Sequence, residues 1–261
     1  MLLGLDHHAH LDDPDWPPAK LLAQLRSTNG WQGTLSAGYG PERFATSRWL
    51  CQHEPRLVRA VGLHPYWLAD RADEPDAVEA GWQALCAELA APGVIAVGET
   101  GLDRTRRERL PLAVQLQWLE RHLALAADAR LPVVLHLVGL HGHALPVLQR
   151  FAPLQGAVHR FSGSLEVAKA YQAVGLHVSL SLEPRVDPVK RARLAAAIAP
   201  DRLLIETDWP FLDLDYPAAL QQMQDLLAQV ALARGVTPAA LALQLADNAR
   251  AAYRWLPPTA A

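Results

Sequence analysis

The first ten residues, MLLGLDHHAH (Met1–His10), place two histidines at the end of a short apolar run. Leu2–Asp6 has the composition of a buried strand, and residues i and i+2 of a strand point to the same face, about 6.6 Å apart. His8 and His10 are therefore predicted to bind one metal ion together. For this pair taken alone, the alternative is a solvated strand end.

The same arrangement recurs four times along the chain, where a short apolar run ends near a histidine or a carboxylate. The four runs are GVIAVGE, LPVVLH, GAVHRF and RLLIETD. Imidazoles with carboxylates suit a divalent ion such as Mg²⁺, Mn²⁺ or Zn²⁺ better than a calcium site or a structural thiolate zinc site. We predict that one or two such ions are bound by His8, His10, Glu99, His136, His159 and Asp208.

Each of these signals has a simpler explanation when it is taken alone. An unpaired buried carboxylate is costly, so Glu99 needs a partner, and an arginine at 104–109 is an alternative to an ion. A lone His136 or His159 is more typical of a hydrogen-bonded core histidine. Glu206, two residues before Asp208, is expected to hold a neighbour or the backbone rather than the ion. The recurrence on five strands is what favours a metal site.

Strand-like and helix-like segments alternate from end to end. The predicted strands are Leu2–Asp6, Gly33–Ala37, Leu57–Leu63, Val94–Gly98, Val133–His136, Gly156–His159, Leu176–Leu180 and Leu203–Glu206. The predicted helices are Pro17–Ser27, Glu42–His53, Asp76–Ala90, Arg109–Arg130, Ala144–Phe151, Leu165–Val174, Pro188–Ile198, Pro217–Arg234 and Pro238–Tyr253.

This alternation is typical of parallel strands covered on both faces, either in a large open sheet or in a (β/α)8 TIM barrel. The candidate ligands distinguish the two, because the carboxyl ends of five strands converge only when the sheet closes. Active sites of such barrels lie at that face. We therefore predict an α/β fold, a single TIM-barrel domain over residues 1–256 with a metal site at the carboxyl-terminal face of the strands, and a frayed tail over residues 257–261.

Composition limits the function classes. The 261 residues are 51% hydrophobic and 20% charged, as in a globular protein with a large core. The net charge of −3 argues against a protein held on nucleic acid by bulk electrostatics, so no stable nucleic-acid partner is expected. Two cysteines without a CxxC pair fit a reducing compartment. Without a signal peptide or an apolar run of about 20 residues, we expect a cytoplasmic monomer that does not enter a membrane.

Three other histidine motifs lie outside the six predicted ligands. His64, in GLHP at the end of the third strand, is predicted to contact substrate or to support a metal ligand. His7 lies on the opposite face from its neighbours and is expected to pack in the barrel wall. His141-Gly-His143 is flanked by glycines and is interpreted as a solvated loop.

The chemistry is expected to depend on the metal site. No glycine-rich phosphate loop, serine nucleophile or Cys–His pair stands out in the sequence. The arginine run at 104–109 can receive a phosphate, although a solvated helix entry is the commoner role of such runs.

Six motifs in order along the chain, together with a closing Asn248 and Tyr253, resemble the TatD family of metal-dependent hydrolases. They are DHHAHLD near the start, GLHP at 62–65, VGETGLD at 97–103, PVVLH at 132–136, VHRFSGS at 158–164 and LLIETDWPFL at 203–212.

The resemblance implies a TIM barrel in which His8, His10, Glu99 and Asp208 hold one ion, while Glu99 bridges to a second ion on His136 and His159. It also implies a deoxyribonuclease that hydrolyses phosphodiester bonds through a metal-activated water, often from a free 3′ end, with DNA as the substrate. Within that framework Glu99 and Asp208 are the predicted catalytic residues, with Asp208 accepting a proton. His64 and Arg160 are predicted to contact substrate or a ligand.

Three departures from the family pattern bear on substrate recognition. Leu137-Val138 replaces the usual Ser-Arg, Arg160 replaces a cysteine, and Leu212–Pro217 lacks an Arg-Gly-Lys-Asn segment. Because basic groups are missing, two alternatives stay open. One is a small-molecule hydrolase of amides, esters or lactones, and the other is an accessory subunit with a structural metal site.

Overall fold

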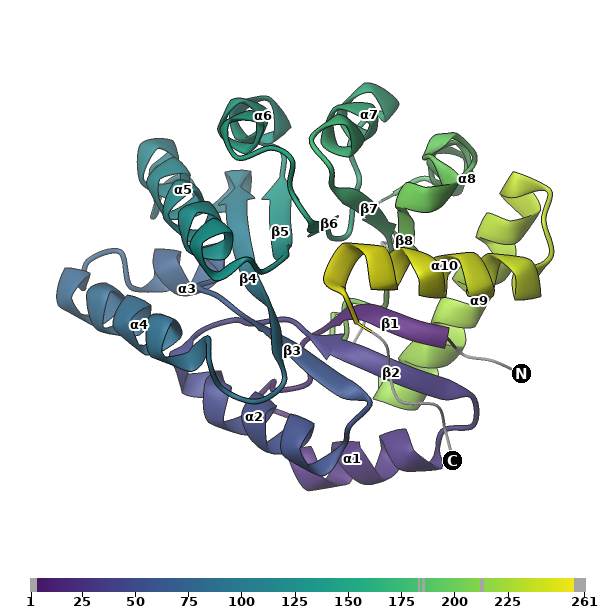
Figure 1. Ribbon diagram of the computed structural model, residues 1–261, viewed down its shortest axis with the longest axis horizontal. Helices are drawn as coiled ribbons and strands as arrows, with labels where there is room; N and C mark the ends of the chain where they lie inside the picture. Colours follow the sequence, from purple (N-terminus) through teal and green to yellow (C-terminus); the bar gives the residue numbers. More distant parts are fainter. Residues whose placement is uncertain (1–3, 183, 185, 212–213, 256–261) are drawn as a thin grey trace.

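The computed structural model describes residues 4–182, 184, 186–211 and 214–255. Eight parallel strands follow one another in sequence order within one sheet, and helices surround the sheet on its outer side (Figure 1). The strands are β1 Gly4–Ala9, β2 Trp31–Ser36, β3 Leu57–Val61, β4 Val94–Asp103, β5 Val133–Val138, β6 Gly156–Val158, β7 His177–Leu180 and β8 Leu203–Ile205. The α-helices are α1 Pro18–Ser27, α2 Phe44–His53, α3 Pro65–Asp70, α4 Pro75–Glu88, α5 Leu112–Ala129, α6 His141–Arg150, α7 Leu165–Ala173, α8 Pro188–Ala197, α9 Tyr216–Arg234 and α10 Pro238–Tyr253.

The sheet closes nearly completely where β8 meets β1. His10 N–H donates to the carbonyl of Trp209 at 2.7 Å, and Asp208 N–H donates to the carbonyl of His8 at 2.9 Å. The buried Asp6 carboxylate joins the same strands, since it accepts hydrogen bonds from the backbone and hydroxyl of Thr207. The predicted (β/α)8 TIM barrel is confirmed, and closure places the ends of β1 and β8 side by side.

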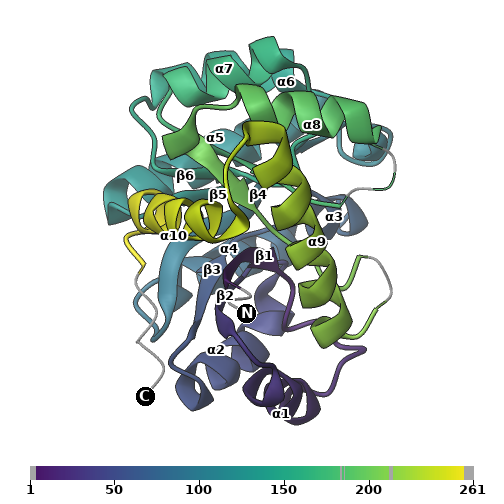
Figure 2. The ribbon, with the colours of Figure 1, turned by 90° about the vertical axis from the view of Figure 1, so that its right-hand side faces the viewer.

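Apolar side chains fill the barrel and the layer between the strands and helices. Inside the barrel, Leu5, Leu35, Val134 and their equivalents pack with Tyr253 and Trp255, at the end of α10 and just beyond it. Leu5, Val58, Ala96 and Val134 of this cluster lie in the first halves of their strands, and α10 packs against β1, β6 and β8, so α10 covers that end of the barrel (Figure 2). Polar side chains line the opposite end, where the strands finish.

Helix starts follow the residues that favour them. Proline lies in the first turn of α1, α3, α4, α8, α9 and α10, where its missing N–H has no helical acceptor to lose. Asp187 and Asp215 accept backbone N–H groups at the starts of α8 and α9. Gly235 ends α9 with φ of +66°, in the left-handed region that glycine adopts without strain.

Several predicted boundaries were wrong. The helix expected over Arg109–Arg130 begins at Leu112, because Pro111 precedes its first turn. β1 continues to Ala9 and β4 continues to Asp103, although both were expected to stop earlier. The predicted loop at His141-Gly-His143 is the first turn of α6.

The short helix α3 was not predicted at all, and some predictions fall outside the described residues. These include the first residues of the Leu2–Asp6 strand, part of Leu212–Pro217 and the tail at 257–261. Within the part of the chain that is described, no single helix is long and apolar enough to cross a membrane. α9 and α10 meet that criterion only as a pair, across a bend of 102°.

Candidate metal centre

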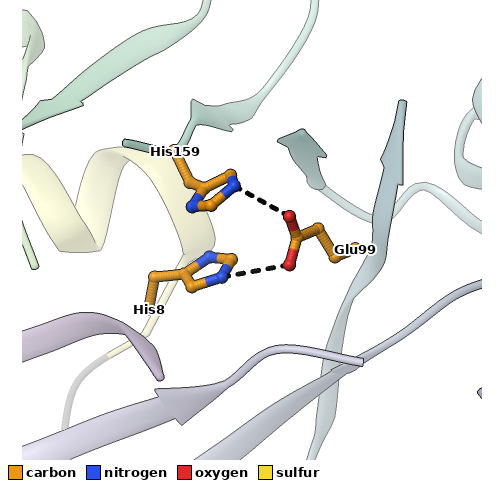
Figure 3. Close-up of side chains that lie close together, drawn as sticks. All are labelled: His8, Glu99 and His159. Atoms are coloured by element: carbon orange, nitrogen blue, oxygen red, sulfur yellow. Dashed lines mark ion pairs between the residues drawn. The ribbon is translucent and has the colours of Figure 1, made fainter. Parts of the chain in front are cut away.

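The six predicted ligands converge at the carboxyl ends of the strands, around the fully buried carboxylate of Glu99 on β4. Its two oxygens face different sets of imidazoles. Figure 3 shows the rings of His8 and His159 stacked one above the other, with the carboxylate of Glu99 facing both. Because this carboxylate presents one oxygen to each set, it can bridge two ions.

One set gathers around Glu99 Oε2. His8 Nε2 lies 3.1 Å from this oxygen and His10 Nε2 lies 3.3 Å from it. Asp208 Oδ1 completes the group at 3.6 Å from His8 Nε2 and 3.9 Å from His10 Nε2. The ligand atoms of His8, His10 and Asp208 lie close enough together to share one ion.

The other set gathers around Glu99 Oε1. His136 Nδ1 lies 2.7 Å from this oxygen and His159 Nε2 lies 2.8 Å from it. His64 Nε2 lies farther away, at 3.3 Å. The ligand atoms of His64, Glu99 and His136 lie within the spacing of a metal site, and His159 Nε2 lies 3.1 Å from His136 Nδ1.

The residues present fit a divalent cation. Glu99 Oε2 and both ring nitrogens of His8 are buried, yet they form no hydrogen bond within the described chain. Buried polar atoms are nearly always satisfied, so atoms that approach one another without hydrogen-bonding geometry point to a shared partner. With imidazole and carboxylate donors, that partner is a cation of intermediate softness, and the cluster can hold one or two such ions.

Asp103 is a site residue that the sequence analysis missed. Its Oδ2 lies 2.8 Å from Nε2 of His136, and both side chains are buried. When Asp103 accepts Nε2–H of His136, the lone pair of Nδ1 is left to bind an ion beside Glu99. The signal was available, because Asp103 follows Glu99 by four residues and therefore shares its face of the extended strand.

His64 faces Glu99 with the other ring nitrogen, Nε2. Its Nδ1 accepts a hydrogen bond from the backbone N–H of Tyr66 at 3.0 Å, so His64 caps the start of α3. Burial lowers the pKa of His64 to about 4, although the nearby Glu99 opposes the shift. The neutral ring therefore carries its proton on Nε2 and donates toward Glu99, which favours a supporting hydrogen bond over an ion ligand.

The two central carboxylates are ionised at neutral pH. Burial alone would raise the pKa of Glu99, but its electrostatic interactions with the imidazoles of His159, His64 and His8 outweigh burial and lower the pKa far below its ordinary value. Burial likewise opposes ionisation of Asp208, and His159, His8 and Arg160 lower its pKa. Ionised carboxylates in a buried pocket attract a cation.

Arg160 and Asp208 face each other across the mouth of the barrel. Both have positive φ, +43° and +56°, a conformation that is uncommon for residues other than glycine. The Arg160 guanidinium lies 2.8 Å from Asp208 Oδ2, and its carbon lies 3.3 Å above the centre of the Phe211 ring. Glu206 accepts the backbone N–H of Arg160, which confirms the prediction that Glu206 holds a neighbour's backbone.

The cluster opens into a cavity of about 430 Å³ lined by His10, Tyr39, His64, Arg160 and Phe211, among others. The remaining candidates lie outside the cluster. His7 is buried, as expected, and burial lowers its pKa to about 3. His141 Nδ1 lies 2.8 Å from the hydroxyl of Tyr171.

Comparison with known proteins identifies the family. The family model described as TatD related DNase matches residues 5–254. This chain belongs to the TatD related DNase family. The resemblance inferred from the motifs is thereby confirmed over nearly the whole chain.

Two individual relatives illustrate the similarity. The uncharacterized metal-dependent hydrolase YjjV of Escherichia coli is 32% identical over 215 residues, covering 81% of each chain. Its solved structure superposes with a TM-score of 0.83 over 97% of this chain and 99% of that one, at 26% identity. The 3′-5′ ssDNA/RNA exonuclease TatD of Citrobacter rodentium is 30% identical over 237 residues, covering 84% of this chain and 86% of the relative.

Proposed function

We propose that this TatD family member is a divalent-metal-dependent nuclease that hydrolyses phosphodiester bonds in single-stranded nucleic acids, including DNA. Hydrolysis is proposed to proceed from the 3′ end. The observation that carries the proposal is the Glu99 carboxylate, whose two oxygens face separate sets of ligand atoms. Two-ion sites of this kind suit in-line displacement at phosphorus. The names of relatives such as the Citrobacter rodentium exonuclease support the substrate class.

The proposed assignment of ligands follows the two oxygens of Glu99. His8, His10 and Asp208 would hold one ion beside Oε2, and His136 and His159 would hold the other beside Oε1. When bound, such ions supply an acidified water and neutralise charge on the phosphoryl oxygens.

The side chains around the ions have distinct proposed roles. Asp208 is ionised and buried, so it can accept a proton from the attacking water. Arg160 lies beside Asp208 and lines the cavity, where its guanidinium can bind a phosphoryl oxygen. His64 keeps Glu99 in place by donating from Nε2.

The experiment is a nuclease assay on metal-stripped protein supplied with Mg²⁺, Mn²⁺ or Zn²⁺. A single-stranded oligodeoxynucleotide labelled at its 5′ end should be shortened stepwise only when metal is present. Glu99→Gln should abolish the reaction, whereas Glu108→Gln, a matched change at an exposed glutamate, should leave it intact. Absence of cleavage by the metal-loaded wild-type protein would refute the proposal.

A second candidate is a small-molecule hydrolase of amides, esters or lactones on the same metal platform. The net charge of −3 favours it, as does the apolar lining of the cavity by Tyr39, Pro210 and Phe211. Turnover of a chromogenic ester panel, with no cleavage of DNA or RNA, would establish this second function. Bound metal without any hydrolysis would instead indicate an accessory subunit.

We also propose that the protein acts as a cytoplasmic monomer that forms no stable nucleic-acid complex. The two free cysteines and the slightly negative charge support these assignments. Gel filtration of the purified protein, with and without an oligonucleotide, together with cell fractionation, tests them.

A further inference from the structure

A second cavity lies beside the first at the mouth of the barrel. The first has a volume of about 430 Å³ and the second about 400 Å³, both within the range that binds ligands. Tyr66, His136, His159 and Arg160 line both cavities. The cavities therefore meet at the metal centre, and a substrate cleaved there can place one part in each.

The two cavities differ in whether a basic side chain in the lining is paired with carboxylates. In the first, Arg43 is already neutralised, because its guanidinium lies 3.1 Å from Asp13 and 4.0 Å from Asp12. The second is lined by Lys190, whose ammonium donates to the carbonyl of Ser162 at 2.6 Å. That bond uses one of the three donors of the ammonium and holds the charge at the edge of the cavity.

One further arginine lies against Tyr66, which lines both cavities. Arg106 belongs to the arginine run that follows β4, and its guanidinium carbon lies 3.6 Å from the centre of the Tyr66 ring. The carboxylates in the lining are already engaged. Asp103 contacts His136 and Thr105, and Asp187 accepts the backbone N–H of Lys190 at 3.0 Å.

We propose that the second cavity binds the phosphate backbone of the continuing nucleic-acid strand, while the first cavity holds the terminal nucleotide. This inference rests on the proposed nuclease function. The phosphates of the strand lie over Lys190 and Arg106, whose side chains can still donate hydrogen bonds. The terminal nucleotide lies in the first cavity, where Arg43 is already paired with carboxylates. Lys190 and Arg106 replace the basic segment that this chain lacks after β8.

The test measures binding separately from cleavage. A fluorescent single-stranded decanucleotide is titrated with metal-free protein in EDTA at several salt concentrations, and affinity is read from anisotropy. Lys190→Ala should weaken binding about fivefold and reduce the slope of log K against log salt by about 0.7, the contribution of one phosphate contact on a single strand. Lys169→Ala, at an exposed lysine on α7 that lines neither cavity, is the matched control.

Cleavage provides a second readout. In the metal-loaded enzyme, Lys190→Ala should lower the ratio of kcat/KM for the decanucleotide to that for a dinucleotide about fivefold, since only the longer strand extends over the second cavity. Equal affinity and salt slope in the Lys190→Ala and Lys169→Ala proteins would overturn the inference while leaving the nuclease function standing.

The two proposals fail in different ways. A wild-type protein that binds the strand through Lys190 but cleaves none would refute the nuclease function and support the strand position. A wild-type protein that neither binds nor cleaves nucleic acid would refute both.

Discussion

Asp103 is expected to set the metal affinity of the centre through His136. Burial alone would raise the pKa of Asp103, but its hydrogen bonds with His136 and Thr105 lower it from 3.8 to about 2. That shift corresponds to about 2.5 kcal/mol in favour of the charged carboxylate. The 2.8 Å contact with Nε2 of His136 is the largest of the contributions that lower this pKa.

Replacing the carboxylate should therefore weaken metal binding without unfolding the barrel. Asp103→Asn keeps an acceptor for Nε2–H but loses the charge, and we expect about a tenfold loss of affinity for Zn²⁺. Asp103→Ala removes the acceptor as well, and we expect about a hundredfold loss, or about 2.7 kcal/mol. Competition with a chromogenic chelator measures both values.

The control separates the contact with His136 from the local turn. Asp103 also accepts the hydroxyl of Thr105 at 2.6 Å, and Thr105→Val removes that bond alone. Thr105→Val should leave zinc affinity unchanged. Zinc affinity in Asp103→Ala equal to that of the wild type, or an equal loss in Thr105→Val, would refute the proposed role of Asp103.

Three further outcomes are expected. Asp208→Asn should lower kcat by about 10²–10⁴-fold with bound metal retained, as checked by elemental analysis, and asparagine tolerates the positive φ at this position. Near-full turnover would refute the role of Asp208 as the base. His122 is buried and accepts the N–H of Leu63 at 3.1 Å, and burial lowers its pKa from 6.5 to about 4. The contribution of neutral His122 to the free energy of unfolding is therefore complete above pH 6.5 and is lost as the pH falls toward 4. In urea titrations, the free energy of unfolding of His122→Gln should fall by about 3 kcal/mol less than that of the wild type over that interval. Asn248→Ala should lower the free energy of unfolding by about 2–4 kcal/mol, because the buried carbonyl of Leu203 and the partly buried carbonyl of Pro200 each lose a 2.7 Å hydrogen bond. A loss below about 0.5 kcal/mol would contradict this.

The positions of the candidate ligands could be predicted because the barrel places every strand end at the same mouth. An apolar run marks a strand, and the first polar residue after it, such as Glu99 or His136, marks the place where the strand leaves the core. This logic needs no knowledge of loop conformation. It brought together side chains that are up to 200 residues apart, since His8 Nε2 lies 3.6 Å from Asp208 Oδ1.

Residues beyond those first polar positions were harder to predict. Gly98 and Gly101 interrupt the apolar run of β4, so the strand was expected to stop before Asp103, although it continues with positive φ at both glycines. The contacts of Tyr66, in α3, and of Phe211 with arginine side chains depend on tertiary packing, which no local pattern reports.

The helix at His141 shows a local pattern that was overridden. Gly139 and Gly142 suggested a loop, and Gly139 does adopt a positive φ of +67°. Gly142, however, lies in the first turn of α6, where a small residue is tolerated and no heavy atom approaches its open side. His141 is therefore held against Tyr171 rather than exposed on a loop.

Anomalous diffraction at the zinc edge from crystals soaked in Zn²⁺ tests the central claim most directly. The convergence of side chains on Glu99 predicts one or two peaks about 2.0–2.2 Å from its carboxylate oxygens, with His8 or His136 in the same coordination shell. Zinc bound only at sites remote from Glu99 would contradict the account.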